Sequence, residues 1–412
     1  MSERECYLSI ITKGSGLLLV ALLKNGQSVS LIGSWTREQM MELRKRESFF
    51  CPACQNEVIL KLGNRRMPHF AHKREGMCPF EHEAESPYHV AGKTDLFHWL
   101  KKQSMNVRLE PYFHHVQQRP DLSVMDQDRL YAFEYQCSTM GEALFRKRND
   151  QYKKAGIRPV WILGAHHLQR LSAYRFKLPR FQWLFAQHVS SVSPQPLIFY
   201  YCPQTKRLIR LVHLIPFSPY YTFSVPVIEK LDRVRFADFL TYPAVPLPSP
   251  FWNEWLAQKK KWRLTFTMYP TLTNRAICFD FYPHHPPALF PCEAGWPLDH
   301  SYLFETPAFI WQTYILLFLA NDETYSLSSL YAWMKEKIAE QKITVRHLPL
   351  AQAYHYTRAV YEYVQWLEQL GYVRWVNRKA VQRIKNWTFP NTIDEALTED
   401  RRLLERMKRK SL

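Results

Sequence analysis

The sequence has no run of about 20 consecutive apolar residues, the length that a membrane-spanning helix needs. The apolar segment at 306–319 is too short, and the polar residues that follow it favour a buried helix. The first five residues lack the basic-then-apolar order of a secretory signal. Only one pair among the eight cysteines is closely spaced, which disfavours a disulfide framework. These absences predict a cytoplasmic protein in a reducing compartment.

Acidic residues are also few, with 37 aspartates and glutamates against 55 lysines and arginines, so the formal net charge is +18. Such an excess of cations predicts an anionic partner, with nucleic acid ahead of anionic lipid. The apolar fraction of 46% excludes a disordered chain, and 412 residues predict two or three domains. Aromatic residues make up 15% of the chain, and we assign most of them to packing rather than to base stacking.

The first domain, residues 1–80, combines a small β unit with a Cys/His-rich module. Strands are predicted at 7–12, 17–23 and 27–32, and a helix capped by Thr36 at 36–46. In the module, a C-x₂-C pair at a turn precedes two histidines at the same spacing, which is close to the ligand pattern of a structural zinc site. The predicted zinc ligands are Cys51, Cys54, His69 and His72, with Cys78 as the alternate for one histidine. The alternative is an incidental cysteine pair with histidines on the surface.

The second domain, residues 81–165, shows an α-β-β-β-α-β order. The predicted elements are a helix at 86–103, strands at 106–112, 122–125 and 131–137, a helix at 140–155 and a strand at 158–163. Ser86 is a natural N-cap, with Pro87 at the first helical position. Glu85, His89 and Lys93 recur every four residues, a pattern that is also typical of a polar helix face in solvent.

Two carboxylates stand on adjacent predicted strands of this domain. Glu134 lies in an apolar, β-prone run where a structural strand would carry Val or Ile, and Asp121 precedes the neighbouring strand. Burying a lone carboxylate is costly unless a cation or hydrogen bonds compensate it. Gln136 falls on the same strand face as Glu134. The arrangement predicts a Mg²⁺ site at which a bound water attacks a phosphodiester.

The ordered set Glu85, Asp121, Glu134 and Gln136 resembles the PD-(D/E)XK nuclease superfamily, in a variant with glutamine at the usual lysine position. With the preceding Cys/His module and the following helix, residues 1–165 resemble the competence protein CoiA family of naturally transformable bacteria. The residues that carry this resemblance are Cys51-Pro-Ala-Cys54, His69-Phe-Ala-His72, Glu85, His89, Lys93, Arg119-Pro-Asp121, Ala132-Phe-Glu134-Tyr-Gln136-Cys-Ser138, Arg148, Tyr152 and Trp161-Ile162.

The resemblance implies an α/β fold (α+β overall) with a restriction-endonuclease-like mixed sheet and a zinc-ribbon-like module before it. It also implies Mg²⁺ or Mn²⁺ ligands at Asp121, Glu134 and Glu85. The implied catalytic residues are Glu85, Asp121, Glu134, Gln136 and Tyr152. Glutamine can position a water but supplies no positive charge, so an inactive fold used for DNA binding is the alternative.

A basic helix follows the strand that carries Glu134. Cations beside a metal site would attract phosphate and give salt-dependent affinity, although a solvated helix face fits the pattern as well. The predicted DNA-binding residues are His89, Lys93, Arg119, Arg146, Arg148, Lys153 and Lys154.

The remainder of the chain carries no motif that points to chemistry. Residues 166–305 are rich in proline and aromatic residues, and they are predicted to be loop-rich connecting structure with some strands. Residues 306–412 are predicted to be helical, with helices at about 328–341 and 350–369, a strand pair at 372–384 and a basic tail at 401–410. This order fits a winged helix and a helical protein-binding domain equally well.

Together with the residues above, the resemblance to the competence protein CoiA family implies three possible functions. The first is a metal-dependent nuclease that processes incoming single-stranded or branched DNA during natural transformation. The second is a catalytically inactive nuclease fold that binds DNA as an accessory to recombination. The third is a zinc-stabilised scaffold that recruits recombination proteins, such as a RecA-type recombinase. Each places the protein in the cytoplasm, and peripheral association with the membrane DNA-uptake machinery is compatible with all three.

Overall fold

The computed structural model of the chain describes residues 18–33, 35–63, 67–73, 78, 85–189, 195–265, 280, 286–320 and 324–410. The predicted strand at 7–12 lies outside them. The chain divides into two compact units. The first unit contains Met1–Gly164, Tyr201–Arg207 and Lys230–Arg233, and the second contains Ala165–Tyr200, Leu208–Glu229 and Val234–Leu412. Over the described ranges, the helices fall short of the length and apolarity that a membrane crossing requires.

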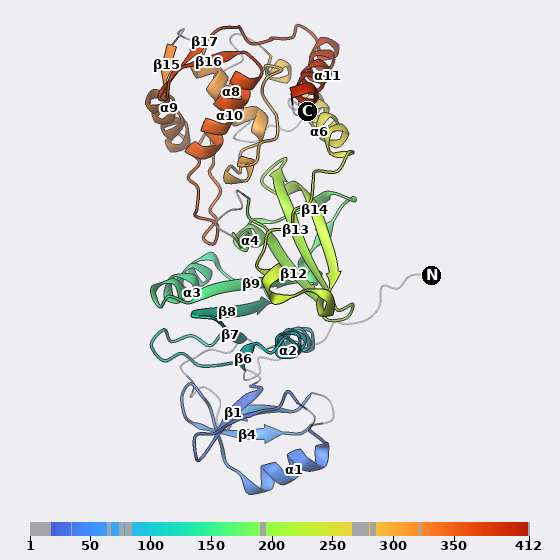
Figure 1. Ribbon diagram of the computed structural model, residues 1–412, viewed down its shortest axis with the longest axis vertical. Coiled ribbons are helices and arrows are strands. Elements are labelled where there is room, and N and C mark those ends of the chain that lie inside the picture. Colours follow the sequence, from blue (N-terminus) through green and yellow to red (C-terminus); the bar gives the residue numbers. More distant parts are fainter. Residues whose placement is uncertain are drawn as a thin grey trace, which may run out of the picture. The chain divides into compact units, whose positions relative to one another are not determined.

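The first unit begins with the N-terminal module, a small antiparallel sheet with one helix (Figure 1). Its elements are β1 (Val20–Leu23), β2 (Ser28–Ser30), α1 (Arg37–Arg46), β3 (Phe49–Phe50), β4 (Glu57–Lys61) and β5 (His69–His72), and the strand order is β2-β1-β3-β4-β5. Residues of β4 alternate between exposed and buried, which places Val58 and Leu60 in the module's core with Phe70. Helix α1 begins where the sequence predicts, because Thr36 and Gln39 form a capping box.

The rest of the first unit is mainly the central domain, whose α-β-β-β-α-β order confirms the prediction. It contains α2 (Pro87–Lys102), β6 (Asn106–Leu109), β7 (Leu122–Asp126), β8 (Arg129–Gln136), α3 (Glu142–Lys154) and β9 (Arg158–Gly164). The strands lie in the order β9-β8-β7-β6 (Figure 1). The β6–β7 and β7–β8 pairs are antiparallel and the β8–β9 pair is parallel, with α3 as the crossover. The domain therefore has the predicted mixed sheet.

The second unit contains more strands than the sequence predicts for residues 166–305. They are β10 (Gln169–Arg170), β11 (Arg175–Lys177), β12 (Ile198–Cys202), β13 (Arg207–Pro216) and β14 (Tyr221–Lys230), in the order β10-β11-β14-β13-β12, and the last residues of β12 fall in the first unit. Strands β12 and β13 are close to the strands that the apolar runs at 197–201 and 208–214 predict. Strand β14 was not predicted, because Pro226 interrupts its apolar run and proline argues against a strand. Helices α4 (Arg180–Trp183), α5 (Phe236–Phe239) and α6 (Phe251–Thr265) complete this part.

The carboxy-terminal part of the second unit is mostly helical, as predicted. Its elements are α8 (Ala308–Phe318), β15 (Thr324–Ser326), α9 (Leu327–Ala339), α10 (Thr357–Gln369), β16 (Val373–Asn377), β17 (Ala380–Arg383) and α11 (Ile393–Lys410). Helix α8 is buried along almost its whole length, as its apolar sequence indicates. Helix α10 begins seven residues later than predicted, and the predicted basic tail at 401–410 is the second half of α11.

Candidate functional site

Two structural features of the central domain bring the predicted carboxylates together. The register of β7 and β8 pairs Leu122 with Phe133, so Asp121 precedes β7 at the point opposite Glu134. Helix α2 lies against β8 at Gly92, where a Cβ would fall 2.1 Å from the ring of Tyr135. Only glycine permits the helix to pack so closely on the strand, and this packing brings the first turns of α2 near Asp121.

Lys93 is at the centre of a buried cluster of charged residues. Its ammonium is fully buried and lies 2.7 Å from both carboxylate oxygens of Glu85 and 2.5 Å from Oε1 of Glu110. Its Nζ is also 3.6 Å from Oδ1 of Asp121. Burial alone would lower the pKa of Lys93, but the surrounding carboxylates outweigh it and keep the pKa well above its usual value. We call Glu85, His89, Lys93, Glu110 and Asp121 the carboxylate–lysine cluster.

Asp121 is ionised within this cluster. Its Oδ2 lies 3.2 Å from Nε2 of His89 and accepts the backbone N–H of Tyr135 at 2.8 Å. Burial opposes ionisation, but His89 and Lys93 outweigh it, and the pKa of Asp121 falls well below its usual value. The pKa of His89 is raised, because the carboxylates of Asp121 and Glu85 overcome the opposite effect of burial.

Glu110 was not predicted from the sequence. It follows β6, adopts a left-handed backbone conformation with φ of +45°, and accepts the backbone N–H of Leu19 through Oε2 at 3.1 Å. The pKa of Glu110 is lowered, because Lys93 and Arg119 outweigh the effect of burial. A carboxylate directly after a strand and before Pro111 was the only sequence signal, and the partners of Glu110 are distant in sequence. Non-glycine residues in this conformation cluster at functional sites.

Glu134 is not among the close ligand atoms of Glu85, His89 and Asp121, and its hydrogen bonds go to residues of α3. Its Oε1 accepts the hydroxyl of Tyr152 at 2.5 Å and a guanidinium N–H of Arg148. The side chain is 4% exposed, and burial raises its pKa to about 7 despite the neighbouring Arg148. Gln136 donates to the carbonyl and hydroxyl oxygens of Ser138. The predicted catalytic residues Glu134 and Tyr152 are therefore brought together, but as a hydrogen-bonded group of their own.

Within the described part of the chain, one group of oxygen and nitrogen ligands in this domain could hold a metal ion. It consists of Glu85, His89 and Asp121, whose ligand atoms all lie within 4.8 Å of one another. Two carboxylates suit Mg²⁺ or Mn²⁺, and an imidazole suits Mn²⁺ better than Mg²⁺. The residues present thus fit such an ion, and two of them, Glu85 and Asp121, are among the metal ligands that the resemblance implies.

The predicted DNA-binding residues divide into two sets. Lys93 is fully buried, Arg119 lies 3.8 Å from a carboxylate oxygen of Glu110, and Arg148 pairs with Glu134. His89 belongs to the carboxylate–lysine cluster. These four residues contact buried carboxylates. Among the predicted DNA-binding residues, Arg146, Lys153 and Lys154 are exposed on α3.

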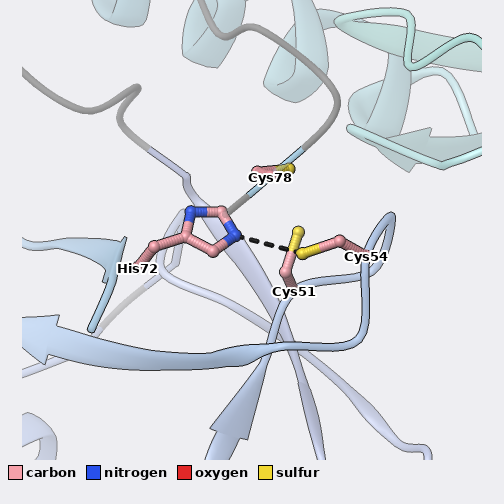
Figure 2. A group of neighbouring side chains, drawn as sticks. All are labelled: Cys51, Cys54, His72 and Cys78. Atoms are coloured by element: carbon pink, nitrogen blue, oxygen red, sulfur yellow. Dashed lines mark hydrogen bonds between the residues drawn. The ribbon is translucent and has the colours of Figure 1, made fainter. Parts of the chain in front are cut away.

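A second group of possible metal ligands lies in the N-terminal module. Cys51, Cys54, His72 and Cys78 have ligand atoms that all lie within 4.8 Å of one another, and Nε2 of His72 is 3.3 Å from Sγ of Cys54. Figure 2 shows the imidazole of His72 turned toward the thiols of Cys51 and Cys54, with Cys78 beside them. Zn–S bonds of about 2.3 Å place the ligands of a tetrahedral zinc about 3.8 Å apart, so the group fits zinc.

The group contains Cys78 where the prediction gave first place to His69. His69 and His72 are three residues apart on β5, so their side chains leave opposite faces of the strand and only one can face the cysteines. The ring Nδ1 of His69 instead lies 2.9 Å from the carbonyl oxygen of Met67. Burial and the adjacent Cys54 raise the pKa of the Cys51 thiol, a cost that a bound cation would remove.

Comparison with known proteins covers most of the chain. Three domain families match it: "Competence protein CoiA, N-terminal domain" over residues 32–81, "Competence protein CoiA, nuclease-like domain" over 85–244, and "Competence protein CoiA, C-terminal domain" over 251–397. Competence protein CoiA of Bacillus subtilis (strain 168) is 31% identical over 343 residues, which are 82% of this chain and 90% of that protein. No solved structure matches the chain. The buried carboxylates of the central domain thus lie in a nuclease-like domain, and the chain belongs to the competence protein CoiA family.

Proposed function

We propose that the chain acts in natural transformation, where it processes incoming DNA in the cytoplasm as a metal-dependent deoxyribonuclease. The observation that carries this proposal is the group of Glu85, His89 and Asp121 in a nuclease-like domain. A Mg²⁺ or Mn²⁺ ion held by these residues would lower the pKa of a bound water and offset the charge of a phosphodiester. Single-stranded or branched DNA is the substrate that this role requires.

The other residues of the site then position the metal ligands. Lys93 is too buried to touch a substrate, and it holds Glu85 beside the ionised Asp121. Tyr135 fixes the second oxygen of Asp121 through its backbone N–H. The side chain of Gln136 donates a hydrogen bond to Ser138. Among the described lysines and arginines, Lys93 is the one that pairs with Asp121. The proposal thus assigns Lys93 a positioning role rather than contact with the scissile phosphate.

The test is cleavage of labelled single-stranded, duplex and branched DNA by the purified chain, with Mg²⁺, with Mn²⁺ and with EDTA. We expect metal-dependent cleavage, and loss of about 2 to 4 orders of magnitude in rate in Asp121→Asn. Asp126→Asn is the matched control, since Asp126 is at the far end of β7 and outside the carboxylate–lysine cluster. Absence of cleavage with either metal, or equal rates for Asp121→Asn and the wild type, would overturn the proposal.

The second candidate is a non-catalytic DNA-binding accessory to recombination. Two observations favour it: Gln136 supplies no positive charge, and Glu134 is engaged by Arg148 and Tyr152 instead of by the metal-ligand group. Salt-sensitive DNA binding that is unchanged by EDTA, without cleavage of any of the substrates, would support this function.

We also propose that Cys51, Cys54, His72 and Cys78 bind a structural zinc ion. The support is the proximity of three thiols and one imidazole in a module whose own core is small. All four positions are filled by protein ligands, so the site leaves no place for a substrate and its role is to stabilise the module.

A further inference from the structure

The carboxy-terminal part of the second unit has the topology of a winged helix. Its elements follow the order α8, β15, α9, α10, β16, β17, and the described strands form an antiparallel sheet in the order β15-β17-β16. Helix, strand, helix, helix, strand, strand, with the first strand paired to the third, is the arrangement of winged-helix domains, a variant of the helix-turn-helix. We call β16, β17 and the turn between them the wing.

The wing and its flanks carry an uncompensated positive charge. Residues 372–386 contain no aspartate or glutamate, and their five cations are Arg374, Arg378, Lys379, Arg383 and Lys385. All but Arg383, which is half-buried, are exposed. In the part of the chain that the structure describes, none of the five forms an ion pair. The guanidinium of Arg374 donates to the neutral Gln382 and that of Arg383 to the neutral Asn386. Like charges so close together repel one another, and an anion bound across them would remove that repulsion.

The helix that would enter a DNA groove in a standard winged helix is less suited to phosphate than the wing. Helix α10 carries the half-buried Glu362 and the exposed Glu368, and Arg358 is the cation that it exposes. Glu362 accepts two backbone N–H groups and contacts the ring of His300, so it is held in place. The charge distribution therefore favours contact through the wing, which fixes position on the DNA backbone but reads no bases.

The shape of the wing favours duplex DNA over a single strand. Proteins that bind single strands offer open aromatic side chains on which bases stack. The one aromatic residue of the wing, Trp375, packs on Tyr361 with ring centroids 5.6 Å apart, and its indole N–H donates to Glu368. The tip instead exposes Val376, Arg378 and Lys379 on a two-stranded ribbon, which is narrow enough to enter a groove of a duplex.

We propose that the wing is a DNA-binding site of its own, which grips the phosphate backbone of duplex DNA without sequence preference. The site belongs to the second unit, whereas the carboxylate–lysine cluster belongs to the first. It requires no cleavage and no metal, so it stands or falls independently of the proposed nuclease activity. Its role is to retain double-stranded DNA, such as a recombining chromosome, while the first unit acts on incoming DNA.

The test compares two triple variants of the full chain that remove the same amount of charge. The wing variant is Arg374→Gln, Arg378→Gln and Lys379→Gln, and the control variant is Lys260→Gln, Lys261→Gln and Lys335→Gln on the exposed faces of α6 and α9. Binding to a short fluorescein-labelled duplex and to one of its single strands is followed by fluorescence anisotropy in EDTA, over a series of NaCl concentrations. Melting temperatures check that both variants are folded.

We expect the wing variant to bind the duplex at least about tenfold more weakly than the wild type. The slope of log K against log [NaCl] should be reduced by about 0.9 for each phosphate that the variant no longer neutralises. The control variant should stay close to the wild type. Equal affinity and slope for the wing variant, or an equal weakening in the control, would overturn the proposal. Weaker binding of the single strand alone would contradict the assignment to duplex DNA.

Discussion

The ammonium of Lys93 and the carboxylate of Glu110 lie 2.5 Å apart in the interior of the first unit, and neither side chain is open to solvent. The same carboxylate accepts the N–H of Leu19 in the N-terminal module. One ion pair therefore joins helix α2, the end of β6 and the start of β1, and it lies beside Asp121, which we propose as a metal ligand.

Replacement of Glu110 by glutamine tests how much this pair stabilises the protein. Glu110→Gln removes one of the carboxylates around the buried Lys93, while Glu85 and Asp121 remain beside it. We therefore expect the variant to lower the free energy of unfolding of the first unit by about 1 to 3 kcal/mol. The control is Glu57→Gln, because Glu57 pairs with Lys73 on the surface and such pairs contribute less than about 1 kcal/mol. Urea unfolding of both variants makes the comparison. Equal losses of stability would show that the buried pair is dispensable.

The pH dependence of stability tests the environment of Glu134. Its pKa is raised from the usual 4.5 to about 7 by burial, so between these pH values the folded protein holds a proton that the unfolded chain releases. Its contribution to stability is therefore full below about pH 4.5 and is lost as the pH rises through about 7. The loss is roughly 3 kcal/mol.

The measurement is urea unfolding of the wild type and of Glu134→Gln across this pH range. The glutamine variant cannot titrate at this position, so its stability should fall less between pH 4.5 and 7 than that of the wild type. Other groups that titrate in the same window contribute to both proteins, and the difference between the two curves isolates Glu134. Parallel curves would mean that Glu134 is ionised throughout and that its pKa is not raised.

The proposed zinc site leads to a prediction in which the two histidines of β5 behave differently. The purified chain should contain one zinc ion, which elemental analysis measures. His72→Asn and Cys78→Ser should lose most of it and lower the melting temperature of the N-terminal module, because structural zinc contributes folding energy directly. His69→Asn is the matched control and should retain the metal. Retention by His72→Asn together with loss in His69→Asn would reverse the assignment.

Much of this fold could be predicted from local signals in the sequence. The caps at Thr36 and Ser86 gave the starts of α1 and α2, and the apolar run around Glu134 gave β8. Asp121 and Glu134 were correctly expected on neighbouring strands, since strand pairing follows from the order of the elements. These features depend on residues that are close together in the chain or on a single pair of adjacent strands.

The partners of the buried groups could not be predicted in the same way. Glu110 contacts Lys93 and Leu19, which are 17 and 91 residues away, so no local pattern marks it as part of the site. The sequence could have shown that only one of His69 and His72 faces the cysteines, because side chains three residues apart leave opposite faces of a strand, but it could not show which one. The polar partners of Glu134 depend on how α3 packs on the sheet, which periodicity does not specify.

Asp400 in the second unit provides the last prediction. Its carboxylate, on α11, accepts a bidentate pair of bonds from Arg263 and lies 2.9 Å from Nζ of Lys259, and all three side chains are buried. Asp400→Asn would leave two buried cations on α6 without a counter-charge, so we expect a loss of about 3 to 5 kcal/mol in the unfolding of the second unit.

Asp394→Asn, in the exposed first turn of the same helix, is the control for Asp400→Asn. This variant removes the same charge as Asp400→Asn, but the interaction that it loses is the weak one with the helix dipole. The expected loss in the free energy of unfolding is therefore less than about 1 kcal/mol. Urea unfolding measures both variants. The pKa of Lys259 is already lowered by burial, so part of the loss in Asp400→Asn should be recovered at high pH, where Lys259 sheds its proton. A loss that does not decrease at high pH would contradict the role of Asp400 as the counter-charge of Lys259.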